Sequence, residues 1–89
     1  MDDLKKHRKQ IDSIDRAIID LLAQRMGHVK DIGIIKKGQD IAPFDDNRWQ
    51  AVLHDRIEFG EQLGLPSEMI GHIWNSIHEQ ALEIEKSNE

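Results

Sequence analysis

The chain has 89 residues, contains no cysteine and carries a formal net charge of −5 at pH 7. A chain this short forms one domain at most, so we expect a single domain over residues 1–89. The missing cysteines exclude a disulfide framework and thiolate chemistry, and they fit a reducing compartment. The acidic balance argues against a general nucleic-acid binder, which would need a basic surface.

Neither a signal peptide nor a membrane span is predicted. The opening residues, MDDLKKHRKQ, are charged and lack an apolar segment. No run of about 18 apolar residues occurs along the chain. We therefore expect a cytoplasmic protein that does not enter a membrane.

The first predicted element is a long amphipathic helix from about Asp3 to Lys37. Apolar residues recur there at alternating steps of three and four, no proline intervenes, and Gly38 is a suitable stop. The stripe includes two polar members, Arg25 and His28, beside Leu4, Ile11, Ile14, Ile18, Leu21, Ile32 and Ile35. A cation on the face that should be buried needs an explanation.

Two shorter helices are predicted after a loop, QDIAPFDD, whose proline and aspartates mark a break and a cap. One runs from about Asn47 to Gln62, and Gly64 stops it. LPSEM then starts the other helix, with Pro66 in its first turn. Their apolar faces carry Trp49, Val52, Leu53, Ile57 and Leu63, followed by Met69, Ile70, Ile73, Trp74, Ile77 and Ala81. No strand pattern occurs, so the fold class is all-α, with one long and two shorter helices.

The first helix is too long for a compact chain of this size. At about 1.5 Å per residue it spans roughly 50 Å, whereas a compact chain of this length has a radius of gyration near 12 Å. Two shorter helices can hardly cover its apolar stripe. We therefore expect an intertwined homodimer, with a monomer that has a frayed first helix as the alternative.

Four cations form the candidate site. Lys36 lies eleven residues after Arg25, which places the two within about 20° of one direction and roughly 16 Å apart, so both can reach one small anion. Arg48 opens the second helix. Arg8 lies about 25 Å from Arg25 along the axis, so it can join the site only from a partner chain. Alternatively, Arg25 snorkels or pairs with an acid such as Asp46, but unpaired buried charge is costly and favours an anion site.

Other catalytic and metal-binding patterns are weak or absent. His54 and Glu58 have helical i, i+4 spacing, and His72 and His78 share the third helix, but no third ligand converges on either pair. No Ser-His-Asp order, Gly-rich phosphate loop or dinucleotide fingerprint occurs. We predict neither a metal nor a cofactor.

The sequence resembles the all-α chorismate mutases, the AroQ class, over nearly the whole chain. The resemblance begins with RKQIDSIDRAIIDLLAQR and ends with GLPSEMIGHIWNSIHEQALEIE. Between them it passes through Lys36 and the segment DDNRW. The ordered set of Arg8, Arg25, Lys36, Asp45 and Arg48 is specific at these spacings, far more than any one member.

The resemblance implies an intertwined three-helix dimer with two equivalent sites that convert chorismate to prephenate in phenylalanine and tyrosine biosynthesis, with no cofactor. Arg8 from the other subunit would hold the substrate's carboxylates together with Arg25 and Arg48. Lys36 would lie against a carboxylate and the ether oxygen, and Asp45 would meet the ring hydroxyl. Further substrate contacts would come from Ile32, Trp49 and Ala81.

Two positions depart from the pattern of that family. Glu85 stands where the family often has a glutamine that donates to the ether oxygen, and a glutamate can donate only when protonated. Trp49 follows Arg48 where an acid commonly helps to bind the ring hydroxyl. The alternatives are an isochorismate pyruvate lyase on the same fold and a non-catalytic helical dimerisation module.

Overall fold

The structure of the chain, a computed structural model, describes residues 2–87 and contains three helices. They are α1 (Asp2–Gly38), α2 (Asp46–Gln62) and α3 (Ser67–Lys86). No strand occurs in the described part of the chain, which confirms the all-α prediction. The outermost residues of the predicted domain, 1, 88 and 89, lie outside the described residues.

The C-terminal end of α1 is closed by a turn that follows Lys36. The N–H of Ile41 donates to the carbonyl of Lys36 at 2.8 Å, and the N–H of Asp40 donates to that of Lys37 at 3.2 Å. This pair of bonds is a Schellman motif, which needs a left-handed residue. That residue is Asp40, with φ of 56°, and not the predicted stop Gly38, which is the last helical residue.

Both ends of α2 have well-defined caps. The Asp45 carboxylate accepts the N–H of Arg48 at 3.0 Å, so the predicted aspartate cap is present. At the other end, Gly64 has φ of 83° and Leu65 donates to the carbonyl of Gly60 at 2.9 Å. In α3, Pro66 takes the capping position just before the helix instead of the predicted place in its first turn.

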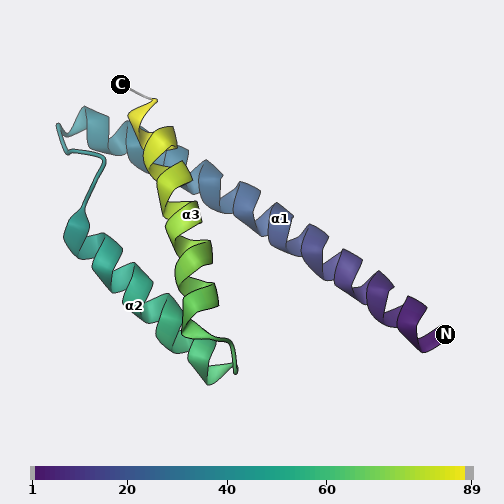
Figure 1. The fold of residues 1–89 in the computed structure, drawn as a ribbon. Helices are drawn as coiled ribbons and strands as arrows, with labels where there is room; N and C mark the ends of the chain where they lie inside the picture. Colours follow the sequence, from purple (N-terminus) through teal and green to yellow (C-terminus); the bar gives the residue numbers. More distant parts are fainter. Residues whose placement is uncertain (1, 88–89) are drawn as a thin grey trace.

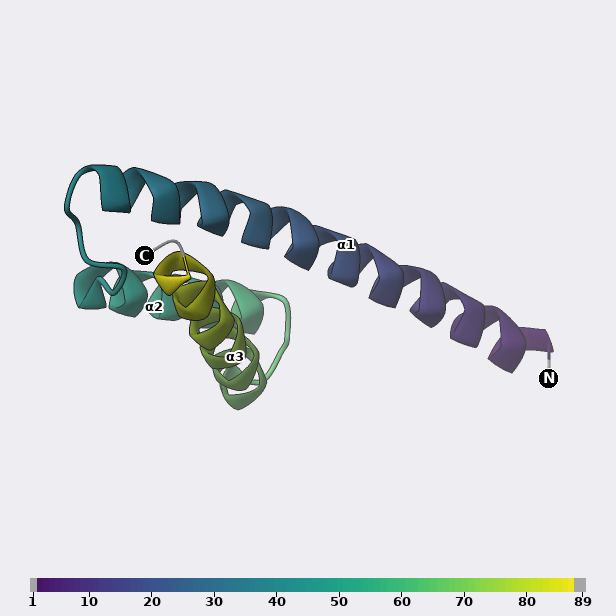
Figure 2. The same ribbon diagram turned by 90° about the horizontal axis from the view of Figure 1, so that it is seen from above.

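Helix α3 holds the fold together because it packs against both α1 and α2. Figure 1 shows α3 beside α2 and crossing α1 near the C-terminal ends of both helices, and Figure 2 shows α1 as a layer across the other two. All three helices contribute buried apolar residues to the core: Val29, Val52, Ile70, Ile77 and Ala81. The small size of this core leaves much apolar surface uncovered.

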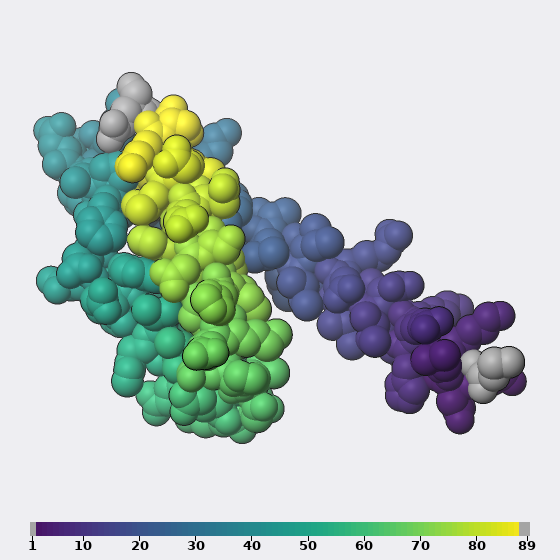
Figure 3. Space-filling view, in the orientation of Figure 1, coloured from purple at the N-terminus to yellow at the C-terminus, as the bar shows by residue number. Residues whose placement is uncertain are grey.

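The N-terminal half of α1 projects away from the rest of the chain (Figure 3). The molecule measures 57 × 23 × 14 Å with a radius of gyration of 16.4 Å, well above the value of about 12 Å for a compact chain of this length. Its apolar stripe is at least half exposed at Leu4, Ile11, Ile14, Ile18 and Leu21. No helix in residues 2–87 is long and apolar enough to cross a membrane.

The predicted stripe differs from the observed packing in the C-terminal half of α1. His28 is exposed and Ile35 is 55% exposed, whereas Val29 and Gly33 are the buried residues. The prediction followed a repeat of seven residues, which drifts by about 20° per heptad around a straight helix. The residues that pack in this half therefore lie next to those predicted.

Candidate active site

A partly open cavity of about 220 Å³ lies between α1 and α2, with α3 along one side. α1 and α2 do not pack on one another within residues 2–87, so the cavity occupies the space between them. Its lining comes from all three helices and the loop before α2: Arg25, Val29, Ile32, Lys36, Pro43, Asp45, Arg48, Trp49, Val52, His78, Ala81, Leu82 and Glu85.

Every predicted site residue except Arg8 lines this cavity. Arg25, Ile32 and Lys36 lie at steps of seven and four along α1, which returns them to one side of the helix. Arg8 is exposed on the projecting part of α1, about 25 Å along the helix from Arg25. A single chain therefore brings together all of the predicted residues but one.

Arg25 carries an unsatisfied positive charge in the cavity. Its Nη1 atom is buried and has no hydrogen-bond partner, and no ion pair to Asp46 or another acid is found for it among residues 2–87. Burial lowers the pKa of Arg25 below its usual range, and the neighbouring charges of Arg56 and then Arg48 lower that pKa further. An arginine nevertheless stays protonated, so an anion bound here would relieve the repulsion.

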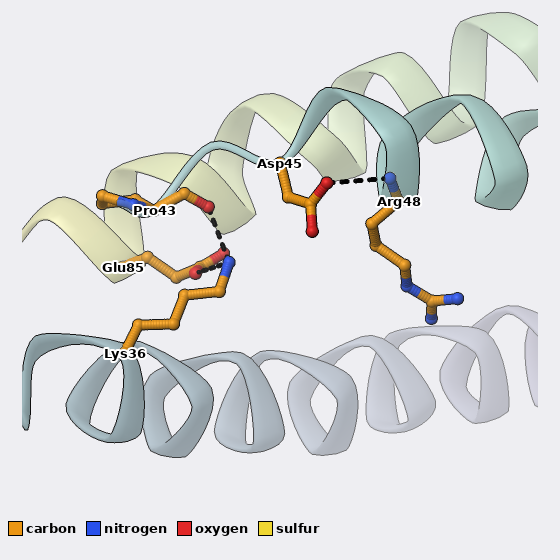
Figure 4. A network of polar contacts seen from close by, with 5 residues as sticks. All are labelled: Lys36, Pro43, Asp45, Arg48 and Glu85. Atoms are coloured by element: carbon orange, nitrogen blue, oxygen red, sulfur yellow. Dashed lines mark hydrogen bonds and ion pairs between the residues drawn. The ribbon is translucent and has the colours of Figure 1, made fainter. Parts of the chain in front are cut away.

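Lys36 is held at the opposite end of the cavity by two oxygen atoms (Figure 4). Its ammonium donates to the carbonyl of Pro43 at 2.7 Å and lies 2.8 Å from Oε1 of Glu85. The Glu85 contact is an ion pair, and the same Oε1 atom is buried and accepts no hydrogen bond from residues 2–87. The Lys36 and Glu85 side chains are only 20% and 10% exposed. The resemblance placed both residues beside one substrate oxygen, and here they lie in contact.

The start of α2 places Asp45 and Arg48 beside the cavity. Because the Asp45 carboxylate caps the helix through the Arg48 N–H, the two residues keep a fixed relation. Figure 4 shows the Arg48 guanidinium extending from α2 toward α1, the helix that carries Lys36. Cations from both helices thus face the same space.

Two stacked rings, those of Trp49 and His78, line the cavity, and the ring of Phe44 lies beside them. Trp49 and His78 stack with their ring centroids 3.9 Å apart and their planes within 9°. Phe44 lies at 5.8 Å from His78, tilted by 58°. Burial lowers the pKa of His78; Glu85 and Glu79 act against that change, while Arg25 adds to it.

Sequence reasoning did not propose five of the lining residues: Val29, Pro43, Val52, His78 and Leu82. A signal existed for His78, because it lies three and seven residues before Ala81 and Glu85 on one face of α3. Val29 lies four residues after Arg25, which gave a similar signal on α1. Nothing in the sequence pointed to Pro43, because its contribution is a carbonyl placed by a loop.

The donor set suits a small anion with two carboxylates. Arg25, Lys36 and Arg48 can bind carboxylates through charge-assisted hydrogen bonds, while Val29, Ile32, Val52 and Leu82 give the cavity apolar walls. No group of three or more histidines, aspartates and glutamates that could hold a metal ion occurs in residues 2–87.

Comparison with known proteins assigns the family. T-protein from Enterobacter agglomerans is 36% identical over 63 residues, which cover 71% of this chain but only 17% of that relative. The chain therefore spans less than a fifth of the length of T-protein. No solved structure matches the chain. The family described as chorismate mutase type II matches residues 7–86, which include every residue that lines the cavity; the chain belongs to the chorismate mutase type II family.

Proposed function

We propose that this protein catalyses the rearrangement of chorismate to prephenate, a step in the biosynthesis of the aromatic amino acids, in the cytoplasm. The observation that carries this function is the buried, unpartnered Nη1 of Arg25 in a cavity that Lys36 and Arg48 also line. A substrate with two carboxylates supplies the negative charge that this group of cations lacks.

The reaction suits the residues of the cavity because it needs no nucleophile. In one concerted step, a carbon–carbon bond forms while the ether carbon–oxygen bond breaks, and no proton is lost or gained. A site accelerates such a step by holding the substrate in its reactive chair geometry. It also accelerates the step by placing donors where the ether oxygen gains negative charge.

Each predicted residue has a place in this mechanism. Arg25 and Arg48 bind the carboxylates and fix the conformation, while Asp45 meets the ring hydroxyl. Lys36 and Glu85 lie side by side, so both can face the ether oxygen, where the ammonium offsets the developing charge. Ile32, Trp49 and Ala81 form the walls against which the ring packs.

The active form is a homodimer in which Arg8 of one chain completes the site of the other. Arg8 lies on the exposed half of α1, too far from Arg25 to share a small ligand within one chain. The exposed apolar stripe on the same half of α1 supports the dimer, because a second copy would cover it.

Product identification tests the reaction directly. The purified protein is offered chorismate and isochorismate in separate assays, and the products are separated and identified. We expect prephenate from chorismate and no pyruvate from isochorismate. Arg25→Ala, which removes a carboxylate contact, should lose most of the activity, whereas Lys86→Ala, an exposed charge removed one residue beyond Glu85, should retain it. Pyruvate release from isochorismate, or no turnover of either compound, would overturn the assignment.

A further inference from the structure

His78 is a cavity residue to which the reaction described above gives no role. The cations of the cavity are matched by the two substrate carboxylates and the ether oxygen, and Glu85 is occupied with Lys36. The ring hydroxyl remains, a group that both donates and accepts a hydrogen bond. Asp45, as a carboxylate, can only accept.

The imidazole of His78 lies against residues that neighbour Asp45 in the chain. It stacks on the ring of Trp49, whose backbone N–H donates to the carbonyl of Asp45 at 3.0 Å. It also contacts Phe44, the residue that precedes Asp45 in the loop. Two aromatic neighbours at an angle to each other restrict rotation of the imidazole, so its edge has a defined direction.

The charge state of His78 at neutral pH suits a hydroxyl partner. Burial lowers its pKa below the usual value of about 6.5, so the ring is neutral at pH 7 and has one donor and one acceptor nitrogen. The charged groups around it are Arg25 on α1, Asp45 and Arg48 at the start of α2, and Glu79 and Glu85 on α3. A carboxylate would bind the arginines instead of this neutral ring.

We propose that His78 hydrogen-bonds the ring hydroxyl of the substrate and thereby selects substrates that carry it, with Trp49 as the residue that positions the imidazole. This role rests on the proposed chorismate mutase activity. It makes the stacked pair a specificity-determining element that one helix alone could not form, because Trp49 belongs to α2 and His78 to α3.

A pair of ligands that differ only in the hydroxyl tests this role. The ligands are a bicyclic dicarboxylate shaped like the transition state of the rearrangement, with its ring hydroxyl, and the same compound without it. Calorimetry gives the Kd of each for the parent protein and for His78→Leu and His78→Gln. Loss of one hydrogen bond should weaken binding of the hydroxylated ligand to His78→Leu by about threefold to tenfold. The deoxy ligand should bind the parent and His78→Leu about equally. His78→Gln should recover part of the affinity for the hydroxylated ligand that His78→Leu loses.

The positioning role of Trp49 has its own readout. Trp49→Phe keeps an aromatic ring against the imidazole of His78, whereas Trp49→Ala removes that ring and lets the imidazole rotate. We expect Trp49→Ala to reduce the ratio of the two Kd values and Trp49→Phe to preserve it. An equal effect of both substitutions on that ratio would overturn the positioning role.

A nuclear magnetic resonance measurement on the parent protein does not depend on the folding of any variant. The ¹⁵N signals of the His78 ring should shift when the hydroxylated ligand binds, and should shift much less with the deoxy ligand. Equal shifts, or equal weakening of both ligands in His78→Leu, would show that His78 only shapes the cavity. If the parent converts chorismate but shows equal shifts or equal weakening, only the role of His78 is overturned. If the parent neither binds these ligands nor converts chorismate, the proposed function is overturned as well.

Discussion

Lys36 is fixed by one charged and one neutral oxygen, from Glu85 and from the Pro43 carbonyl. A lysine held at both sides loses little further freedom when the reaction begins, which is the condition for electrostatic catalysis. We expect Lys36→Ala to reduce kcat by about 100-fold or more, as for other lost oxyanion donors. Steady-state kinetics at saturating chorismate measures this, and Lys86→Ala is the matched control. A kcat within about a factor of three of the parent would remove Lys36 from the catalytic step.

Glu85 presents a different chemical question, because a carboxylate near the ether oxygen would repel the charge that develops there. A protonated carboxyl donates a hydrogen bond, and glutamine is a permanent donor of nearly the same shape. We therefore expect Glu85→Gln to preserve or raise kcat/KM at neutral pH.

The measurement for Glu85 is kcat/KM of both proteins at neutral pH, with circular dichroism to show that they are folded. An unchanged or higher kcat/KM in the variant would show that a neutral donor can replace the carboxyl group. A folded but inactive variant would instead show that the ion pair with Lys36 is required.

His78 should make stability depend on pH. Its pKa in the folded chain is lowered from the usual value of about 6.5, so the unfolded chain takes up the proton first as the pH falls. The free energy of unfolding should therefore decrease between about pH 6.5 and the lower folded-state pKa. Urea unfolding of the parent, His78→Asn and the exposed His72→Asn, at one protein concentration, measures this. Only His78→Asn should show a smaller slope with pH, and a slope unchanged from that of the parent would contradict the prediction.

At the scale of the elements, the helices were predictable because their signals are local. The break before α2, its aspartate cap and the glycine after it each act within a few residues, and the structure has all of them. The end of α1 was less clear, because Asp40 takes the left-handed position that glycine usually fills. The buried face of α1 depended on where α3 packs. A heptad count could not supply that position, so it selected His28 over Val29.

The contact between α2 and α3 depends on Gly60. A Cβ atom at this position would lie 2.7 Å from Cγ1 of Ile70, which is near the backbone of a buried side chain and cannot move aside easily. We expect Gly60→Ala to destabilise the protein by about 1–3 kcal/mol through overpacking. Gly71 on α3 has open space around it, so Gly71→Ala should stabilise the protein by about 0.5–1 kcal/mol. Urea unfolding at one protein concentration gives the free energy of unfolding of both variants. If Gly60→Ala is as stable as Gly71→Ala, or more stable, this account of the packing is wrong.

At the scale of the whole molecule, one chain does not contain the whole predicted site, because Arg8 lies too far along α1 from the other residues. The cavity gathers residues from three helices and a loop, and sequence spacing could place only those that share one helix. The family resemblance supplied the others, including Asp45 and Glu85. Arg8 and the exposed stripe remain without a partner surface in the isolated chain, so the whole site is a property of the proposed dimer.

The proposed dimer can be tested by the mass of the protein in solution and by a substitution that should break the dimer apart. Sedimentation equilibrium at micromolar concentration should give twice the monomer mass. Ile18→Asp places a charge on the exposed apolar stripe and should produce an inactive monomer. Ile34→Asp is the matched control, because Ile34 is also about half exposed but lies about 160° around α1 from Ile18. An active monomer of the parent would contradict the dimer, and an equal effect of both substitutions would show that the stripe is not its interface.

Complementation decides whether Arg8 acts across subunits. Arg8→Ala and Arg25→Ala should each be nearly inactive alone, since every site in either homodimer lacks one arginine. In a mixed dimer, one site receives the intact Arg25 of one chain and the intact Arg8 of the other, while the second site lacks both. After unfolding and refolding of an equal mixture, half of the dimers are mixed and each has one intact site. About a quarter of the parent activity should therefore return, given two equivalent sites per dimer. If Arg8 served its own chain, both sites of the mixed dimer would lack one arginine, and mixing would restore nothing.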